Sequence, residues 1–451
     1  MVDDTIVALA TPPGISGLAV IRLSGKDSLS IAEKCFNPKG KIINSPTHTI
    51  HFGWIIHKDI RIDNVTASVF LEPKSYTGEN SVEIACHGGM LIADEIINAL
   101  IDCGARMAEP GEFTRRAFLN GKMDLMQVEA VADLIHSVTV PGIIVAARQL
   151  HGEFTVRISK LRRMLLDICS LLEIELDFSD EDLTFVKKDK IKADVVEVIA
   201  FCKSLAESYK AAEILRSGFF VGIAGFPNSG KSTLFNALLR KKRAIVSEIP
   251  GTTRDYLEEN IILNGMTIKL IDTAGLRETQ NIIEMEGIKL VQSVLEQSNL
   301  ILVLNDISIS PKHSDELLHK LNKEYPEQKI VLIQNKIDKI DFKPIEQKSD
   351  YIYISAKTGE GIEKLENLLE REARKNTEGI VDVLVNQRHA LLLRQVSEQL
   401  SAAICSIDEG RENELISLDI RNAVNLLGEL SGENWNEDVL NNIFSRFCIG
   451  K

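Results

Sequence analysis

A glycine-rich loop that could hold phosphate groups begins at Gly225 and is the first of four motifs with a common chemistry. It reads Gly-Phe-Pro-Asn-Ser-Gly-Lys-Ser, follows an apolar run and precedes a helical pattern. A strand, a glycine loop and a helix in this order form a P-loop, whose backbone N–H groups face phosphate oxygens. Lys231 adds a mobile positive charge, and the Ser232 hydroxyl can bind magnesium. The loop therefore predicts a nucleoside triphosphate site.

The base is indicated by Asn335-Lys336-Ile337-Asp338, which follows the strand-like run 330–334. A carboxylate at Asp338 can accept the ring N–H and the exocyclic amine of guanine, and adenine would leave that carboxylate unpaired. Ser355-Ala356-Lys357, after another strand-like run, can supply a backbone N–H for the guanine oxygen. These two motifs predict guanine and disfavour an ATP-dependent enzyme.

The fourth motif, Asp272-Thr273-Ala274-Gly275, lies between the phosphate loop and the base motifs at the end of a strand-like run. Asp272 can hold magnesium through water, and Gly275 can approach the terminal phosphate. Four motifs in this order predict a GTP hydrolase. The expected nucleotide contacts in these motifs are Asn228, Ser229, Gly230, Lys231, Ser232, Thr233, Asp272, Thr273, Ala274, Gly275, Asn335, Lys336, Asp338, Ser355, Ala356 and Lys357.

Small GTPases commonly orient the attacking water with a glutamine directly after the Asp-x-x-Gly motif. In this chain that position is Leu276, whose apolar side chain cannot orient water. Two local features can take its place. The amide carbonyl of Asn228 could coordinate a monovalent cation, and the Glu284 carboxylate could position water directly or through another water. Loop geometry and a solvated helix charge are the respective alternatives, and the residues alone leave both open.

Length, charge and cysteine content limit the remaining possibilities. A chain of 451 residues suggests about three domains. A net charge of −13 argues against non-specific binding of nucleic acid, although a local basic patch would still permit a specific RNA. The N-terminus is acidic and no run of 18 apolar residues occurs, so we expect a cytoplasmic protein without membrane association. Seven scattered cysteines fit neither a disulfide framework nor a zinc site.

The pattern of apolar residues divides the chain into four segments. Residues 1–120 combine short β-like runs with turns and predict an α+β domain, and residues 121–216 show the four- and three-residue steps of long helices. Residues 217–377 contain the nucleotide motifs and predict a Ras-like α/β domain. The helical pattern returns in residues 378–451. We therefore expect a multidomain protein in which the GTPase domain is inserted into an all-α domain.

Several stretches of the chain resemble a known family. Residues 247–255 look like the switch I and potassium loop of potassium-activated GTPases. Residues 4–14, 110–124, 418–429 and the terminal Phe-Cys-Ile-Gly-Lys resemble the tRNA modification GTPase MnmE (TrmE) family over essentially the whole chain. Pro250, where many members carry alanine, is a mild departure.

The resemblance implies an activity that the nucleotide motifs do not. With an FAD-dependent partner, MnmG, the family adds a carboxymethylaminomethyl or aminomethyl group to the wobble uridine of certain tRNAs, using a tetrahydrofolate one-carbon unit. It also implies a folate-binding N-terminal domain, a homodimer through that domain, and a heterotetramer with MnmG.

The resemblance also implies site residues by position. The positions at which the family binds folate are Arg22, Glu83, Lys122 and Lys451 in this sequence, and Cys448 would lie close to the one-carbon unit. The family's magnesium ligands correspond to Ser232 and Thr253, and its potassium ligands correspond to Asn228, Ser247, Ile249 and Thr252. Its general-base-like glutamate corresponds to Glu284. The nucleotide set then extends over Ser247, Glu248, Ile249, Pro250, Gly251, Thr252 and Thr253.

The alternative is a GTPase switch that assists ribosome assembly without modifying RNA. Such a protein would be expected to append a basic RNA-binding domain. The Thr-Pro-Pro-Gly stretch near the N-terminus and the terminal Cys-Ile-Gly-Lys favour the tRNA-modifying interpretation instead.

Overall fold

The computed structural model describes residues 4–177, 188–242, 258–272, 292–308, 311–340, 351–377, 383–445, 447 and 449–451. The chain forms two compact units, each built from separated segments. The first unit comprises Met1–Ala132, Leu150–Val195 and Gln399–Lys451, and the second comprises Asp133–Gln149 and Val196–Glu398.

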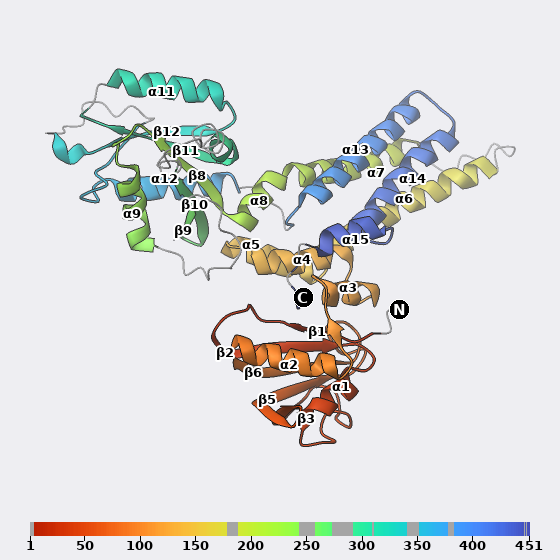
Figure 1. Cartoon of the computed structure of the whole chain (residues 1–451). Coiled ribbons are helices and arrows are strands. Elements are labelled where there is room, and N and C mark those ends of the chain that lie inside the picture. Colours follow the sequence, from red (N-terminus) through yellow and green to blue (C-terminus); the bar gives the residue numbers. More distant parts are fainter. Residues whose placement is uncertain are drawn as a thin grey trace, which may run out of the picture. The chain divides into compact units, whose positions relative to one another are not determined.

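A seven-stranded sheet forms the centre of the N-terminal part of the first unit (Figure 1). Its order is β3-β4-β5-β6-β2-β1-β7, and only the pair β1 and β7 is parallel. The strands are β1 (Ile6–Leu9), β2 (Ser16–Ser24), β3 (Phe36–Asn37), β4 (Thr49–His57), β5 (Ile60–Phe70), β6 (Ser81–Gly88) and β7 (Arg106–Met107).

The pairing of the neighbouring strands β2 and β6 brings two charged residues together. Ala19, Ile21 and Leu23 point into the core beneath α1 (Ser28–Cys35) and α2 (Met90–Asp102). Because side chains alternate along a strand, the intervening Arg22 lies on the opposite face. The antiparallel register places it directly opposite Glu83 of β6.

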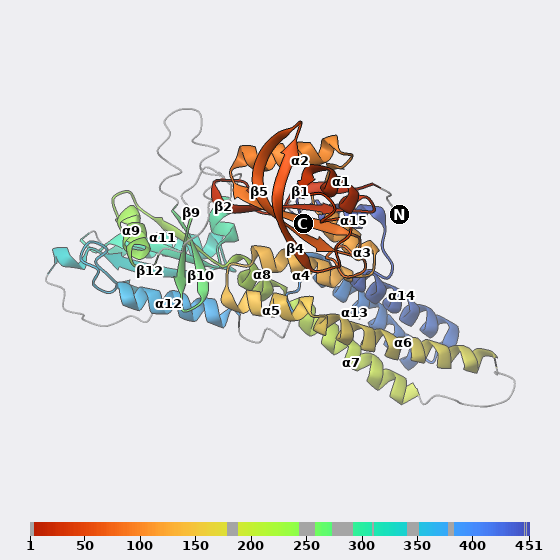
Figure 2. The same ribbon diagram turned by 90° about the horizontal axis from the view of Figure 1, so that it is seen from below.

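The rest of the first unit is helical and includes α3 (Glu112–Leu119), α6 (Glu153–Asp177), α14 (Asn413–Ser431) and α15 (Glu437–Phe444). Long helices α6 and α14 run side by side (Figures 1 and 2). The apolar residues that recur at four- and three-residue steps along α6 are buried at Phe154, Ile158, Leu165, Ile168 and Leu172, and Leu161 is partly buried. Helices α4 (Leu125–His136), α5 (Val140–Leu150), α7 (Lys188–Glu207) and α13 (Gln387–Asp408) cross from one unit to the other.

The second unit contains a six-stranded sheet of order β13-β12-β11-β8-β10-β9, parallel except for β9. Its strands are β8 (Phe219–Gly225), β9 (Glu258–Leu263), β10 (Met266–Asp272), β11 (Leu300–Asp306), β12 (Lys329–Asn335) and β13 (Tyr351–Tyr353). Strand β11 is buried at every residue, as expected for a parallel strand covered on both faces.

Helices cover both faces of this sheet. Apolar residues of α9 (Lys231–Lys242) and α12 (Ile362–Lys375) pack on one face, and those of α11 (Pro311–Glu324) pack on the other (Figures 1 and 2). Helix α8 (Tyr209–Ser217) leads into β8, and a short 3-10 helix, η2 (Ile337–Lys339), follows β12. The carboxyl ends of β8, β10 and β12 therefore meet at one edge, where ligands bind to such sheets.

Candidate functional site

The phosphate loop lies between β8 and α9, in the strand-loop-helix context that its sequence predicts. Gly225 has a φ of +146°, and a Cβ atom there would lie 2.3 Å from the carbonyl oxygen of Leu304. The Lys231 ammonium folds back over the loop and donates to the carbonyl oxygens of Gly225 and Phe226, at 3.1 and 3.0 Å. A phosphate group could take the place of these carbonyl partners.

The base motif is tied directly to the phosphate loop. Asn335, at the end of β12, donates from Nδ2 to the Ser229 carbonyl at 2.9 Å, and its Oδ1 accepts from the Ala356 N–H at 3.0 Å. A Cβ atom at Gly230 would lie 2.3 Å from that same Nδ2 atom. One buried amide therefore holds together three motifs, although 106 positions separate Asn335 from Ser229 in sequence.

Lys336 forms a second link, and it involves a residue that the motifs did not indicate. Its ammonium donates to the Asn228 carbonyl at 2.6 Å and pairs with Asp306 at 2.7 Å. Burial opposes ionisation of Asp306, but hydrogen bonds from Lys336 and Ser308 lower its pKa to about 2. Asp306 ends β11, the strand beside β12, and this neighbouring position is the only sequence signal for it.

Asp338 lies in η2 and faces Ser355 of the second base motif. Its Oδ1 atom accepts a hydrogen bond of 2.6 Å from the Ser355 hydroxyl. This hydrogen bond is the main cause of a lowered Asp338 pKa, so the side chain is an anion at neutral pH. An exposed carboxylate held in this way is suited to pair with the two N–H groups of guanine.

Magnesium would be held by Ser232, in the first turn of α9. Asp272 ends β10 in register with Ile223 of β8. The hydroxyl chemistry and the glycine-lined loop fit a magnesium-bound triphosphate. Other predicted residues lie outside the described residues: Ser247, Glu248, Ile249, Pro250, Gly251, Thr252, Thr253, Thr273, Ala274, Gly275, Glu284 and Cys448.

A second group of predicted residues lies in the first unit. Arg22 pairs with Glu83 at 2.9 Å, and its guanidinium stands 4.8 Å from the Tyr76 ring and 5.7 Å from the Phe113 ring. We call these four residues the Arg22 site. The Nη1 atom of Arg22 is buried without a hydrogen-bond partner among the described residues. A buried guanidinium donor of this kind is usually satisfied, so Nη1 is a donor that a ligand acceptor could satisfy.

The other two predicted folate residues are held by separate contacts. Lys122 donates to the Pro73 carbonyl at 2.9 Å, and its methylenes lie over Gly78, in the loop that also contains Tyr76. Lys451 is half-buried at the end of the C-terminal segment. The adjacent Gly450 passes so close to β1 that a Cβ atom would lie 2.2 Å from the Leu9 carbonyl oxygen. The structure thus brings Arg22 and Glu83 into contact and places Lys122 and Lys451 on segments packed in the same unit.

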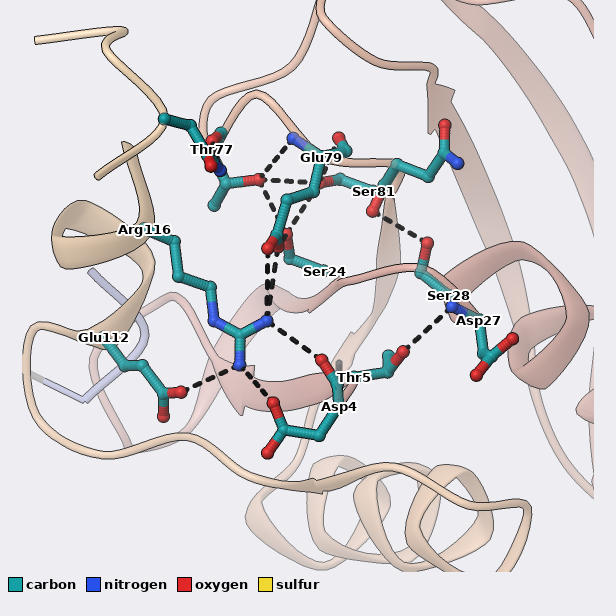
Figure 3. A network of polar contacts seen from close by, with 12 residues as sticks. Asp4, Thr5, Ser24, Asp27, Ser28, Thr77, Glu79, Ser81, Glu112 and Arg116 are labelled. Carbon is teal, nitrogen blue, oxygen red and sulfur yellow. Dashed lines mark hydrogen bonds and ion pairs between the residues drawn. The ribbon is translucent and has the colours of Figure 1, made fainter. Parts of the chain in front are cut away.

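A buried ion network supports the Arg22 site, and sequence reasoning did not identify it (Figure 3). Arg116 of α3 pairs with Asp4 at 2.7 Å, with Glu112 at 2.9 Å and with Glu79 at 3.3 Å, while its side chain is only 6% exposed. Glu79 also accepts from the Ser24 hydroxyl at 2.8 Å. Arg116 therefore fastens α3 to the start of β1 and to the loop that precedes β6.

This network reaches the Arg22 guanidinium through Tyr76. The Tyr76 hydroxyl and the Thr114 hydroxyl are 2.9 Å apart, so the same loop is bonded to α3 at a second point. Phe113 and Tyr76, which flank Arg22, thus belong to the two elements that Arg116 joins. Burial opposes ionisation of Glu112, yet hydrogen bonds from Arg106 and from the Glu109 backbone lower its pKa and keep it charged.

Comparison with known proteins shows which family the chain belongs to. Residues 5–122 match the family described as the GTP-binding protein TrmE N-terminus, and residues 125–448 match the MnmE helical domain. A protein of Christiangramia forsetii named tRNA modification GTPase MnmE is 42% identical, over 100% of this chain and 99% of its own length. The chain belongs to the MnmE family.

A second curated relative gives the same result. A protein of Flavobacterium psychrophilum with the same name is 41% identical, over 99% of each chain. Among solved structures, the G domain of the T. maritima FeoB iron transporter is 29% identical and covers 34% of this chain and 98% of its own, with a TM-score of 0.27. The predicted resemblance to MnmE and the predicted multidomain fold class are confirmed. Among the described helices, none is both long and apolar enough to span a membrane.

Proposed function

We propose that this chain is a GTP hydrolase that acts in tRNA modification. The single observation that carries the proposal is the link between motifs around Asn335, which joins the phosphate loop to the base motif in a chain of the MnmE family. Lys231 and the loop N–H groups would bind the phosphates, and Asp338 would select guanine. Ser232 and Asp272 would hold magnesium, which neutralises phosphate charge when it is bound.

For hydrolysis, we infer a role for potassium and for Glu284. Asn228 has a φ of 62°, a left-handed conformation that fixes the loop where its amide would face the phosphates. With Ser247, Ile249 and Thr252 it would supply neutral oxygen ligands, which suit a large monovalent cation. Potassium would provide the positive charge that an arginine finger provides elsewhere, Thr253 would join Ser232 at magnesium, and Glu284 would position water.

The Arg22 site is proposed to bind a tetrahydrofolate derivative. Arg22 and Glu83 together offer donors and acceptors, which a pterin edge requires, and the buried Nη1 atom of Arg22 is a donor that a ligand could satisfy. Lys122 and Lys451 would balance the carboxylates of a glutamate tail. Gly450 packs against β1, and this contact would hold the neighbouring Cys448 near the one-carbon unit.

The proposed reaction involves further partners. An FAD-dependent MnmG subunit would act with this chain on the wobble uridine of certain tRNAs and add a carboxymethylaminomethyl or aminomethyl group. A homodimer through the N-terminal domains and a heterotetramer with MnmG complete the proposal, and the protein would act in the cytoplasm.

Reconstitution tests this function. Purified chain, the FAD-dependent subunit, unmodified tRNA, methylenetetrahydrofolate, GTP and an amine, either glycine or ammonium, are combined in potassium or sodium buffer. Digested tRNA is then analysed for modified uridine by mass spectrometry. We expect product only in the complete potassium reaction. GTP hydrolysis without any modified uridine in that reaction would favour the ribosome-assembly alternative, and equal hydrolysis in sodium would refute the potassium role.

A further inference from the structure

Two thiols of the N-terminal part lie in contact although 68 positions separate them in sequence. The Sγ atoms of Cys35 and Cys103 are 3.2 Å apart. Cys35 is the last residue of α1, and Cys103 directly follows α2. Both helices pack on the same face of the seven-stranded sheet, so the sulfur atoms meet where the helices end side by side.

The geometry is close to that of a covalent link. A disulfide has an S–S distance of about 2.05 Å, so the sulfur atoms need to approach by only about 1 Å. The contact is also anchored, because Cys35 donates from Sγ to the Ala99 carbonyl of α2 at 3.3 Å. Among the described cysteines, Cys86, Cys169 and Cys202 are buried and Cys405 is exposed.

The two thiols differ in access. Cys35 is 2% exposed, whereas Cys103 is partly exposed to solvent. Burial, together with the contact between the two sulfur atoms, raises the pKa of Cys35 to about 12. The Lys34 ammonium donates to the Cys103 carbonyl at 3.3 Å, and Lys39 adds a second positive charge near the pair. An oxidant from solvent would therefore meet Cys103 first.

We propose that Cys35 and Cys103 form a redox-modification site that hydroperoxides convert to an intramolecular disulfide. The Cys103 thiolate attacks one peroxide oxygen and becomes a sulfenic acid while water leaves. The Cys35 sulfur then attacks the Cys103 sulfur, the S–S bond forms, and a second water leaves with the Cys35 proton. In total, two thiols and one hydrogen peroxide yield one disulfide and two waters.

The bond would join the ends of α1 and α2 and close a loop that contains β3 to β6, Glu83 included. Closing a long loop restricts the unfolded chain, so the oxidised first unit is more stable than the reduced one. The site lies on the helix-covered face of the sheet, opposite the Arg22 face, and in a different unit from the phosphate loop. GTP hydrolysis is therefore unchanged by the oxidation.

Peptide mapping of the full-length protein tests the proposal directly. The reduced protein is treated with limiting hydrogen peroxide, quenched, alkylated with N-ethylmaleimide in denaturant and digested. The expected product is a peptide pair that contains Cys35 and Cys103, is lighter by two hydrogen atoms than the two thiol peptides, and separates with dithiothreitol. Because wild-type protein is used, the result does not depend on how a variant folds.

Variants separate the roles of the two thiols. Cys35→Ser should leave Cys103 as a sulfenic acid, trapped with dimedone, and Cys103→Ser should give neither product at these residues. Cys405→Ser, which removes an exposed thiol without a described sulfur neighbour, should behave as wild type. Oxidation should raise the melting temperature by several degrees in wild type and not in Cys35→Ser. If Cys405 or Cys448 is consumed while Cys35 and Cys103 stay fully alkylated, the proposal is overturned.

Discussion

The two candidate sites are held together in different ways. Around the guanine motif, short polar contacts join loops that follow neighbouring parallel strands, and Asn335 reaches two of these loops by itself. The Arg22 site is built from β2, β6, α3 and a loop, and a buried arginine with three carboxylates joins α3 to that loop and to Asp4, which precedes β1. Sheet topology positions the first site, whereas charge pairing within the core positions the second.

Because of this difference, we expect substitutions in the two sites to have different effects. A substitution in the nucleotide site should change catalysis or base choice and leave the fold intact, because its chemistry lies on loop residues. A substitution in the ion network should lower stability and ligand affinity together, since removal of one partner leaves buried charges uncompensated.

The largest expected effect is on GTP turnover. Glu284→Ala should slow hydrolysis by about 10²–10⁴-fold, because a group that positions water acts mainly in the transition state. GTP affinity, measured with a fluorescent analogue, should stay nearly unchanged, and single-turnover assays at saturating GTP give the rate. Glu286→Ala, which removes the next carboxylate in the same stretch, is the matched control and should turn over GTP as wild type does. Unchanged turnover in Glu284→Ala would mean that Glu284 has no catalytic role and is only a solvated charge on a helix.

A smaller but qualitative change concerns base choice. Asp338→Asn should weaken GTP binding by about 10²-fold and improve binding of xanthosine triphosphate, because an amide N–H can donate to the xanthine carbonyl. Calorimetric titration with both nucleotides measures the change, and Asp338→Ala, which has neither group, should bind both weakly. A mutant that retains a strong preference for GTP would mean that Asp338 does not contact the base.

In the first unit, we expect Arg116→Met to lower the free energy of unfolding by about 3 kcal/mol, because Glu79 loses its arginine partner while Asp4 and Glu112 keep only Arg106. Binding of 5-formyltetrahydrofolate should weaken by about tenfold, since Tyr76 and Phe113 no longer fix Arg22. Urea unfolding and calorimetry measure the two effects.

The neighbouring Arg115 provides the control for that experiment. Arg115 is partly exposed and pairs with the exposed Glu437 at 2.6 Å. Arg115→Met should cost less than about 1 kcal/mol and leave folate affinity unchanged. Equal effects of the two substitutions would show that the buried network has no special role in the Arg22 site.

The smallest effect is a pH dependence in the second unit. The folded Asp306 pKa of about 2 lies below the ordinary value of 3.8, so its pairing stabilises the fold fully above a pH of about 4. That contribution, at most about 2 kcal/mol, is lost as pH falls from about 4 to about 2. Urea unfolding at several pH values should show a shallower acid slope for Asp306→Asn than for wild type. Identical slopes would contradict a stabilising Lys336–Asp306 pair.

Contiguous motifs explain why the nucleotide site could be predicted in large part from sequence. Asn335, Asp338 and Ser355 each follow an apolar run that forms a parallel strand, so their meeting at one edge follows from topology. Asp306 was missed because it belongs to no motif at the end of β11. Its role depends on the ion pair with Lys336, which follows the neighbouring strand β12.

The Arg116 network could not be predicted because its partners are remote in sequence. Glu79 is 37 positions away and Asp4 is 112 positions away, and neither lies in a recognisable chemical pattern. Without register, Arg22 and Glu83 are likewise two isolated charges 61 positions apart. Only the family resemblance indicated them as a site, and only the structure gives their flanking rings.

The most direct measurement is the wobble-uridine content of tRNA from a strain that lacks this protein and carries either wild type or Cys448→Ser. Nucleoside mass spectrometry should show the modified uridine restored by wild type and absent or sharply reduced with Cys448→Ser, whose purified protein hydrolyses GTP normally. Modified uridine at the wild-type level in the strain without the protein would contradict a role in tRNA modification, and a normal level with Cys448→Ser would show that the thiol is dispensable.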